Sequence, residues 1–411
     1  MSKTITRITS NKPVYEDNDP QDHLVTLNLG PTHPATHGVF QNVLQIDGER
    51  IVSCVSTIGY IHRAFEKIAE HRPFYQITPL TDRMNYCSSP INNMGWHMTV
   101  EKLLGIEIPK RVQYMRVIIM ELARITDHII CNGILGVDTG AFSGFLYLMQ
   151  ERENIYEIYE EICGARLTTN IGRIGGFERD FNDIAWRKIR AFLDRFPAVL
   201  KEFEDLFVRN RIFIERTSGV AAVTAEQAMD YSWSGPLLRA TGIDYDIRVQ
   251  DPYCSYEEFD FEVPVGTNGD VYDRFMVRNE EMWQSMRIIE QALEKIEKEP
   301  KGVFHADVPG LYLPPKEQVY NNMEALIYHF KLVMGEVDAP KSEVYLAVEG
   351  ANGELGFYLI NDGGRTPYRL HFRRPSFINY QMFAHMSEGM VLADAIINMS
   401  SLNVIAGELD A

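Results

Sequence analysis

The sequence predicts a mainly α protein with a small N-terminal β-sheet and a C-terminal β-hairpin, an α+β fold. Three patterns carry this prediction. Residues 24–60 hold short runs in which apolar side chains alternate with others, which is typical of strands. From Tyr60 onward the apolar residues recur at helical spacing. Near the C-terminus, two alternating runs flank the turn Gly350–Gly353, which is a strong hairpin signal.

The N-terminal strands are separated by the stretch Gly30–Val39, which reads GPTHPATHGV. Its two prolines restrict the backbone and its two glycines allow conformations that a Cβ atom would penalise, so the stretch is a stiff turn. We expect a β-hairpin with His33 and His37 at its tip, followed by a third strand from Arg50. Taken alone, the pattern also fits a surface turn with solvated histidines.

The middle of the chain is expected to be helical. Helical spacing covers residues 96–104, 112–134, 140–162, 184–207 and 279–298. Asp183 and Asn279 are candidate N-caps for the last two of these helices, and Pro315 can begin another that runs to about Met334. Phe259–Pro264 alternates and is expected to be a strand-like insert.

These patterns divide the chain into three parts. We expect a flexible N-terminal arm over residues 1–23, a β region over 24–60 and a helical core with β inserts over 61–411. The arm is polar and lacks the apolar centre of a secretion signal. The most apolar stretch, residues 117–137, contains charged residues, so membrane contact is expected only through partner proteins.

Composition excludes some functions. The 411 residues carry 57 acidic against 40 basic side chains, a net charge of −17, which argues against nucleic-acid binding. None of the five cysteines forms a C-x-x-C pair, so a zinc or iron–sulfur site made by this chain alone is not expected. Free thiols and the missing signal favour a reducing compartment.

Eight blocks of sequence, in the same order, resemble the 49-kDa subunit (the D subunit) of respiratory complex I, the proton-pumping NADH:quinone oxidoreductase. After the turn GPTHPATHGV come IGYIHRAFEK, LTDRMNY, VEKLLGIEIPKR, ELARITDHI, DPYCSYEEFDFEVPVGTNGDVYDRF, VEGANGELGFYLINDGGRTPYR and ADAIINMSSLNVIAGELD. The resemblance covers nearly the whole chain after residue 24. It implies the fold of the nickel–iron hydrogenase large subunit, whose core is a long helical bundle.

The resemblance also implies catalytic residues. It assigns His37 and Tyr86 to the quinone head group, and it assigns Asp138 to a pair with His37 that raises the pKa of the imidazole. The residue types fit, because an imidazole exchanges protons near neutral pH and a phenol can donate a hydrogen bond to a carbonyl. On their own, the tyrosine is more often an ordinary core residue and the aspartate is usually a helix cap.

Arg63, Arg83 and Thr168 are placed by the same resemblance near a 4Fe–4S cluster held by the adjacent small subunit. The alternative for the arginines is an ordinary ion pair with Glu66 or Asp82. Thr168 stands where relatives usually have a histidine, and a threonine cannot titrate near pH 7. The family usually has glycine where this chain has Ala64, and it usually ends in an arginine.

Two positions argue against hydrogenase chemistry. Hydrogenases bind nickel and iron through an R-x-C-G-x-C segment, and here Asn85 and Ser88 stand in place of the cysteines. The matching C-terminal segment, residues 403–410, contains no cysteine. We therefore expect no metal bound by this chain.

The resemblance implies the quinone-site subunit of the peripheral arm of complex I, inactive alone and binding no cofactor of its own. Electrons would pass from the partner's cluster to quinone, the substrate. The implied partners are the small iron–sulfur subunit (the B subunit), the C and I subunits and the membrane-embedded H subunit, at the cytoplasmic side of a bacterial inner membrane. The alternatives are the matching subunit of a ferredoxin- or F420-linked enzyme and, further off, a hydrogenase-related or scaffold subunit.

Overall fold

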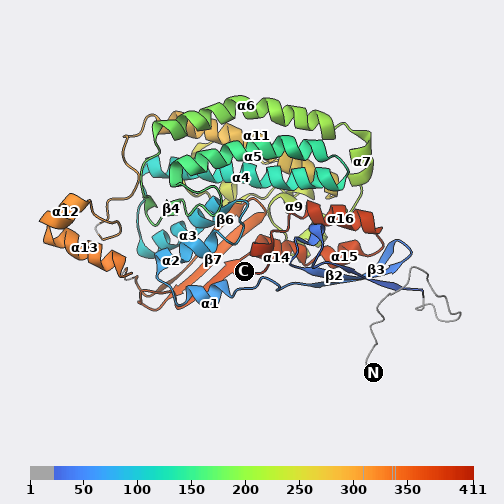
Figure 1. The fold of residues 1–411 in the computed structure, drawn as a ribbon, viewed down its shortest axis with the longest axis horizontal. Coiled ribbons are helices and arrows are strands. Elements are labelled where there is room, and N and C mark those ends of the chain that lie inside the picture. The colour runs from blue at the N-terminus through green and yellow to red at the C-terminus, as the bar shows by residue number, and fades with distance from the viewer. Residues whose placement is uncertain (1–22, 309, 336, 338) are drawn as a thin grey trace, which may run out of the picture.

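The computed structural model describes residues 23–308, 310–335, 337 and 339–411. Long helices form a bundle on one side of the molecule, and small antiparallel sheets lie along the other side (Figure 1). The predicted mainly α fold with β at both ends is confirmed. Of the predicted N-terminal arm, only His23 lies within the described residues, and the division into three parts stays a prediction.

The bundle is built from five long helices. They are α3 (Ser89–Leu104), α4 (Lys110–Asp138), α5 (Phe142–Cys163), α6 (Asp183–Phe207) and α11 (Val271–Ile296). Helix α4 packs between α5 and α11 and is buried along most of its length, which explains why its sequence is apolar on more than one face. Within the described ranges, none of the helices has the length and apolar character needed to cross a membrane.

Shorter helices connect the bundle to the sheets. They are α1 (Phe65–Ala69), α2 (Phe74–Thr81), α7 (Arg211–Thr217), α8 (Ala225–Asp230), α9 (Gly235–Ala240), α10 (Ile247–Gln250), α12 (Lys316–Asn321), α13 (Met323–Val333), α14 (Pro375–Tyr380), α15 (Phe383–Ser387), α16 (Leu392–Ser401) and α17 (Ala406–Leu409), with 3₁₀ turns η1 (Pro34–Thr36) and η2 (Tyr256–Glu258). Helix α1 begins after Ala64, whose φ of 54° is the left-handed conformation that glycine adopts without strain.

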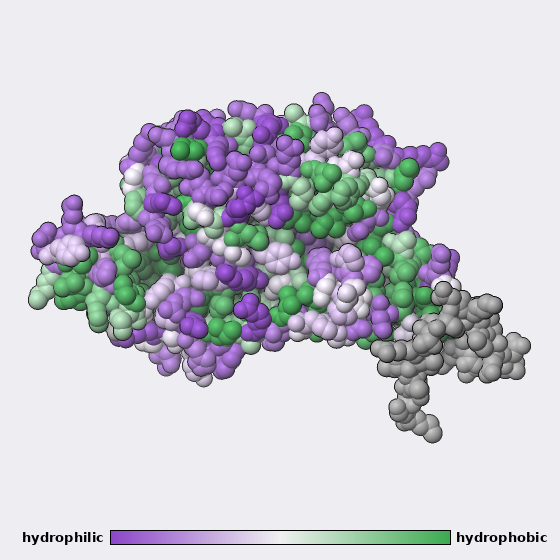
Figure 2. All heavy atoms as spheres, in the orientation of Figure 1, coloured by the Kyte–Doolittle hydropathy of each residue, from purple (hydrophilic) through white to green (hydrophobic). Residues whose placement is uncertain are grey.

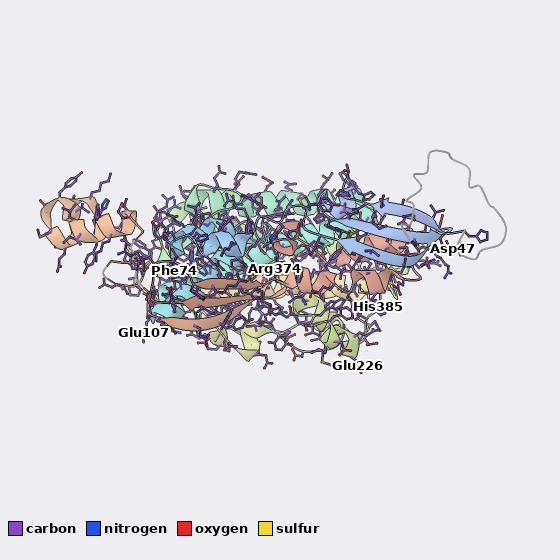
Figure 3. All side chains as sticks on the ribbon, turned by 90° about the horizontal axis from the view of Figure 1, so that it is seen from below. Asp47, Phe74, Glu107, Glu226, Arg374 and His385 are labelled. Carbon is purple, nitrogen blue, oxygen red and sulfur yellow. The ribbon has the colours of Figure 1, made fainter. Side chains whose placement is uncertain are left out.

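Among the described residues, the strands form two three-stranded sheets and one short ladder. The first sheet has the order β1 (Val25–Leu29), β2 (Gln41–Asp47), β3 (Arg50–Thr57), and the last has the order β6 (Ser342–Gly350), β7 (Gly353–Asn361), β8 (Arg369–Arg373). The two-residue strands β4 (Gly172–Arg173) and β5 (Gly176–Phe177) pair with each other. Both predicted hairpins are confirmed, but β8 extends the C-terminal one into a sheet. Figure 3 shows Asp47 at the end of the molecule opposite to α12 and α13.

The predicted helix caps are wrong at two places. Asn182, not Asp183, caps α6, because its Oδ1 accepts the N–H of Ala185 at 2.8 Å. Helix α11 begins two turns before Asn279 and is capped by Asp270, whose carboxylate accepts the N–H of Asp273. Charged side chains in those first two turns hide the apolar periodicity on which the prediction depends.

Two further elements differ from the prediction. Residues 259–264 form no strand, because the N–H groups of Asp260 and Glu262 are bonded by glutamine side chains of α11 instead of a neighbouring strand. The helix predicted from Pro315 is two helices, since Asn322 ends α12 and caps α13 by accepting the N–H of Glu324 at 2.9 Å.

The α12–α13 pair projects from the body and carries an apolar stripe (Figures 1 and 2). Met323, Leu326, Phe330 and Val333 recur at helical spacing along α13, and each side chain is more than half exposed. Monomeric soluble proteins rarely leave an apolar patch of this kind uncovered.

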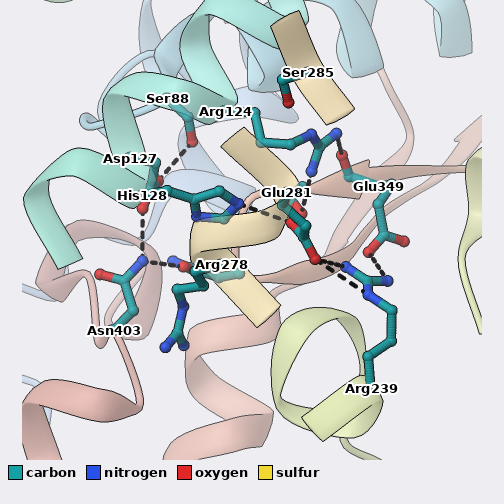
Figure 4. Close-up of polar contacts among 12 residues, drawn as sticks. Ser88, Arg124, Asp127, His128, Arg239, Arg278, Glu281, Ser285, Glu349 and Asn403 are labelled. Carbon is teal, nitrogen blue, oxygen red and sulfur yellow. Dashed lines mark hydrogen bonds and ion pairs between the residues drawn. The ribbon is translucent and has the colours of Figure 1, made fainter. Parts of the chain in front are cut away.

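A cluster of charged side chains lies at the centre of the fold, where α9, α11 and β6 meet. Arg239 of α9 donates to Glu281 of α11 at 2.6 Å and to Glu349 of β6 at 2.8 Å, and all three are buried (Figure 4). On the other side of this cluster, Arg248 contacts Glu121 of α4 at 3.3 Å. The ion pairs join elements that are far apart in the sequence.

We expect Arg239→Met to lower the free energy of unfolding by about 3–5 kcal/mol, because it leaves Glu281 and Glu349 as buried charges without their main partner. The matched control is Arg211→Ala, which removes an exposed partner of Glu215 and should cause no measurable change. Urea unfolding of the purified chain measures both. Equal effects of the two substitutions would contradict a central role for the buried cluster.

Candidate functional site

A pocket of about 330 Å³ lies between the tip of the N-terminal hairpin, α4, α5 and the C-terminal segment. Its polar lining residues are His37, Tyr86, Arg152, Ser400 and Asn403, and its walls include Phe40, Ile134, Phe145, Met149 and Met399. The structure therefore brings together His37 and Tyr86, which are 49 residues apart in the sequence. An apolar pocket with a few polar groups is typical of a site for a small organic ligand.

The hairpin tip holds His37 through its own hydrogen bonds. The 3₁₀ turn η1 is capped by His33, whose Nδ1 accepts the N–H of Ala35 at 3.1 Å. His37 ends the turn with a φ of 53°, and its ring meets the edge of Phe40 at 6.0 Å between centroids. The protein around the ring removes part of its water and so lowers the pKa of His37 below 6.5.

Tyr86 reaches the pocket from the segment before α3. This segment lies against Gly407, where a Cβ atom would stand 2.4 Å from the carbonyl oxygen of Arg83. The Tyr86 hydroxyl makes no hydrogen bond within the described part of the chain and is left available to a ligand. Burial raises the pKa of Tyr86 to about 12, so the phenol keeps its proton at neutral pH and can donate it in a hydrogen bond.

Asp138 is not the partner of His37. As the last residue of α4 it faces α16 and accepts a short hydrogen bond from the hydroxyl of Ser400, a lining residue of the pocket. The histidine that acts electrostatically on Asp138 is His33, and the ring of His37 packs against Phe40. The predicted pair between these two described residues is not formed, and the pKa of His37 is lowered, not raised.

The other predicted site residues lie outside the pocket. Arg83 is about half exposed, donates to the carbonyl of Pro79 at 2.8 Å and lies 3.8 Å from Asp82. The same Asp82 carboxylate accepts the N–H of Asn170, which ties the segment of half-buried Thr168 to the neighbourhood of Arg83. The ion pair between Arg83 and Asp82 is the simpler alternative predicted from the sequence for Arg83.

Arg63 is exposed and lies over the ring of Phe65, 5.7 Å from its centroid. Its alternative partner, Glu66, instead pairs with Arg369 at 2.7 Å and with His371 at 2.9 Å. Arg63 therefore presents a cation at the surface.

Asn85 and Ser88 hold a carboxylate. Asp127 of α4 accepts from Asn85 at 2.8 Å, from Ser88 at 2.9 Å and from Asn403 at 2.6 Å (Figure 4). The two positions at which the resemblance would place metal-binding cysteines thus carry an amide and a hydroxyl that bind a carboxylate. Across the described ranges, no group of three or more His, Cys, Asp or Glu side chains is arranged to hold a metal ion.

The network continues to a second buried acid. Asn403 donates to Asn352, Asn352 to the hydroxyl of Ser376 at 3.4 Å, and that hydroxyl to Glu408. Burial and the charge of Asp127 raise the pKa of Glu408 to about 7, against the effect of the hydrogen bonds from Ser376.

Sequence reasoning did not single out three lining residues, Arg152, Ser400 and Asn403. For Arg152 a signal existed: Phe145, Met149 and Arg152 are spaced i, i+4, i+7 and share one face of α5. For Ser400 and Asn403 no local pattern marks the position, because their roles depend on α16 returning to the end of α4.

Comparison with known proteins gives a consistent result. A family model described as "Respiratory-chain NADH dehydrogenase, 49 Kd subunit" matches residues 138–411. The chain is 73% identical over 390 residues to the D 2 subunit of the NADH-quinone oxidoreductase of Cytophaga hutchinsonii, covering 95% of this chain and 99% of that protein. It is 71% identical over 395 residues to the D subunit of the Flavobacterium johnsoniae enzyme, covering 96% and 95%. It is also 46% identical over 409 residues to the C/D subunit of the Bdellovibrio bacteriovorus enzyme, covering 98% of this chain and 72% of that protein.

The raised pKa of Glu408 gives a testable dependence of stability on pH. The protonated carboxyl is favoured in the folded chain, so its contribution to stability is complete below about pH 4.5 and is lost as the pH rises through about 7. Between about pH 5 and about pH 8, the wild type should lose roughly 2.5 kcal/mol of unfolding free energy relative to Glu408→Gln. Urea unfolding at several pH values measures this, with Glu297→Gln as an exposed control. Parallel curves for wild type and Glu408→Gln would contradict the prediction.

Proposed function

Because this chain belongs to the family of the 49-kDa subunit of respiratory-chain NADH dehydrogenase, and is thus a subunit of an NADH-quinone oxidoreductase, we propose that its pocket at His37 and Tyr86 holds the head group of quinone during reduction. The observation that carries this proposal is the convergence of an imidazole and an unbonded phenol on one apolar pocket. A quinone head group is a flat apolar ring with a carbonyl oxygen at each end. Phe40 and Phe145 offer walls for the ring, and Tyr86 offers a donor for a carbonyl.

Reduction of a quinone by two electrons makes both of its oxygens basic, so two protons must be supplied. Tyr86 keeps its proton until a strongly basic oxygen forms, because its pKa is raised to about 12. His37 is mainly neutral at pH 7 and donates a hydrogen bond from a ring N–H to the other oxygen. The second proton passes through this imidazole, which takes up a proton from water on its other ring nitrogen as it releases the first to the oxygen.

The electron donor is proposed to be a 4Fe–4S cluster of the adjacent small subunit. Arg63 and Arg83 are exposed cations, and Thr168 is tied to the segment of Arg83 through Asp82. A cation beside a reduced cluster would stabilise its added negative charge. This chain supplies no cofactor of its own and is expected to be inactive alone.

The proposed partners are the small iron–sulfur B subunit, the C and I subunits and the membrane-embedded H subunit. The Bdellovibrio relative, whose name joins C and D, supports adjacency to the C subunit. A peripheral position at the cytoplasmic side of a bacterial inner membrane follows from the same assignment. The names of the relatives favour NADH over ferredoxin or F420 as the source of electrons.

Tyr86→Phe is expected to leave the complex assembled and to reduce quinone reductase activity at least about tenfold, or about 1.4 kcal/mol of transition-state stabilisation. The apparent KM for a short-chain quinone should rise, since the head group loses a donor. Steady-state kinetics in membranes measure both quantities. The control is Tyr368→Phe, which removes an exposed hydroxyl. Unchanged turnover in Tyr86→Phe would show that Tyr86 does not bind the quinone head group.

Thr168 gives a separate prediction for the assembled complex. The midpoint potential of the partner's cluster should vary little between about pH 6 and about pH 8, because a threonine cannot exchange a proton there. Thr168→His should introduce a slope of up to about 60 mV per pH unit, the value for one electron and one proton. Redox titration followed by electron paramagnetic resonance measures the slope, with Thr168→Val as control. A steep slope in the wild type would show that another group exchanges the proton.

A further inference from the structure

The side-chain amide of Asn403 is held in one orientation. Its Nδ2 donates to Asp127 at 2.6 Å and makes a second, shorter hydrogen bond to Oδ1 of Asn352. An ionised carboxylate only accepts hydrogen bonds, so the nitrogen of Asn403, not its oxygen, must face Asp127. Asp127 is itself fixed by Asn85 and Ser88 on its other oxygen.

The second acceptor of the Asn403 amide, Oδ1 of Asn352, is also fixed in its orientation. Nδ2 of Asn352 points to the hydroxyl of Ser376, which leaves Oδ1 of Asn352 for Asn403. Ser376 in turn donates to Glu408, so the donors of this network run in one direction, away from the pocket. Turning the amide of Asn403 over would place its oxygen against two acceptors.

This orientation leaves the carbonyl oxygen of Asn403 for the pocket. Oδ1 accepts no hydrogen bond from the described residues, is not one of their buried unpaired polar atoms, and belongs to a residue of the pocket lining. Figure 4 shows it pointing away from Asp127 with no partner. The backbone of Asn403 has a φ of 51°, a left-handed conformation that asparagine tolerates better than most residues.

We propose that Asn403 is a head-group ligand selective for the reduced substrate: its Oδ1 accepts a hydrogen bond from a hydroxyl of quinol. This inference rests on the proposed function of the pocket. The carbonyl oxygens of a quinone are acceptors and gain nothing from a second acceptor, whereas a quinol hydroxyl can donate to it. The pocket then holds donors that serve the oxidised ring, Tyr86 and His37, and one fixed acceptor that serves the reduced ring.

The inference has a kinetic consequence. Quinol should bind more tightly than it would without the acceptor, by about tenfold for one buried hydrogen bond. Quinone binding should depend little on Asn403. Product inhibition by quinol and the KM for quinone therefore separate the two roles.

The test compares Asn403→Leu with Asn352→Ala in membranes that contain the assembled complex. Leucine is close to asparagine in size and removes the acceptor, whereas Asn352→Ala removes one partner of the Asn403 amide nitrogen and keeps the Asn403 carbonyl oxygen, which Asp127 still orients. We expect the inhibition constant of a short-chain quinol to rise about tenfold in Asn403→Leu, with the KM of the matching quinone changed less than about twofold. In Asn352→Ala the quinol constant should stay within about threefold of wild type.

If the inhibition constant of quinol and the KM of quinone change in proportion in Asn403→Leu, the role of Asn403 is merely structural and the inference is overturned. An unchanged inhibition constant of quinol in this variant also overturns it. If Asn403→Leu fails to assemble, Asn403→Gly decides, because glycine adopts the same left-handed backbone without strain and also removes the acceptor. An unchanged quinol constant in Asn403→Gly rejects the acceptor role. Tyr86→Phe, measured beside them, keeps the two proposals distinguishable. If Tyr86→Phe raises the KM for quinone and Asn403→Leu leaves the inhibition constant of quinol unchanged, the pocket remains the proposed quinone site. Only the selectivity of Asn403 for quinol is then rejected.

Discussion

The fold depends on the requirement that charges inside a protein must be paired. Arg239 reaches Glu281 and Glu349 only if α9, α11 and β6 meet at one point, and Arg248 reaches Glu121 only if α10 lies beside α4. An ion pair between well-packed elements adds modest net stability, but a missing partner is costly, so the cluster penalises any other arrangement of these elements. In the correct fold, every charged side chain of this cluster has a partner of opposite charge.

The same constraint places the candidate site. His128 of α4 meets Glu281 at 2.8 Å, and the neighbouring residue on that helix, Asp127, is the centre of the second network. Fixing α4 by the ion pairs therefore fixes Asp127 and, one turn later, Cys131 in the wall of the pocket. The two networks differ in kind: one balances opposite charges, and the other surrounds a single carboxylate with neutral donors. Neutral donors hold the pocket wall without adding charge next to a ligand.

Much of the fold and of the candidate site can be predicted from the sequence, and the features that cannot be predicted have physical causes. The burial of α4 and the hairpin that carries His37 follow from local periodicity and turn chemistry, so both are predictable. The start of α11 is hidden because Arg274 and Arg278, both buried, occupy positions that a surface helix would fill with apolar side chains. The partner of Asp138 is hidden because Ser400 comes from a distant segment, while the ring of His37 packs against Phe40. Ser400 and Asn403 reach the pocket because α16 returns to the end of α4, and no local pattern in the sequence records that packing.

The apolar stripe of α13 has a consequence for how cells must make this protein. Water around Met323, Leu326, Phe330 and Val333 is displaced favourably by any other apolar surface, including the same stripe on a second copy. A free chain would therefore be prone to associate with itself, and the tendency would grow with its concentration. Synthesis in step with the other subunits would keep that concentration low, which makes balanced expression a condition for obtaining this chain in soluble form.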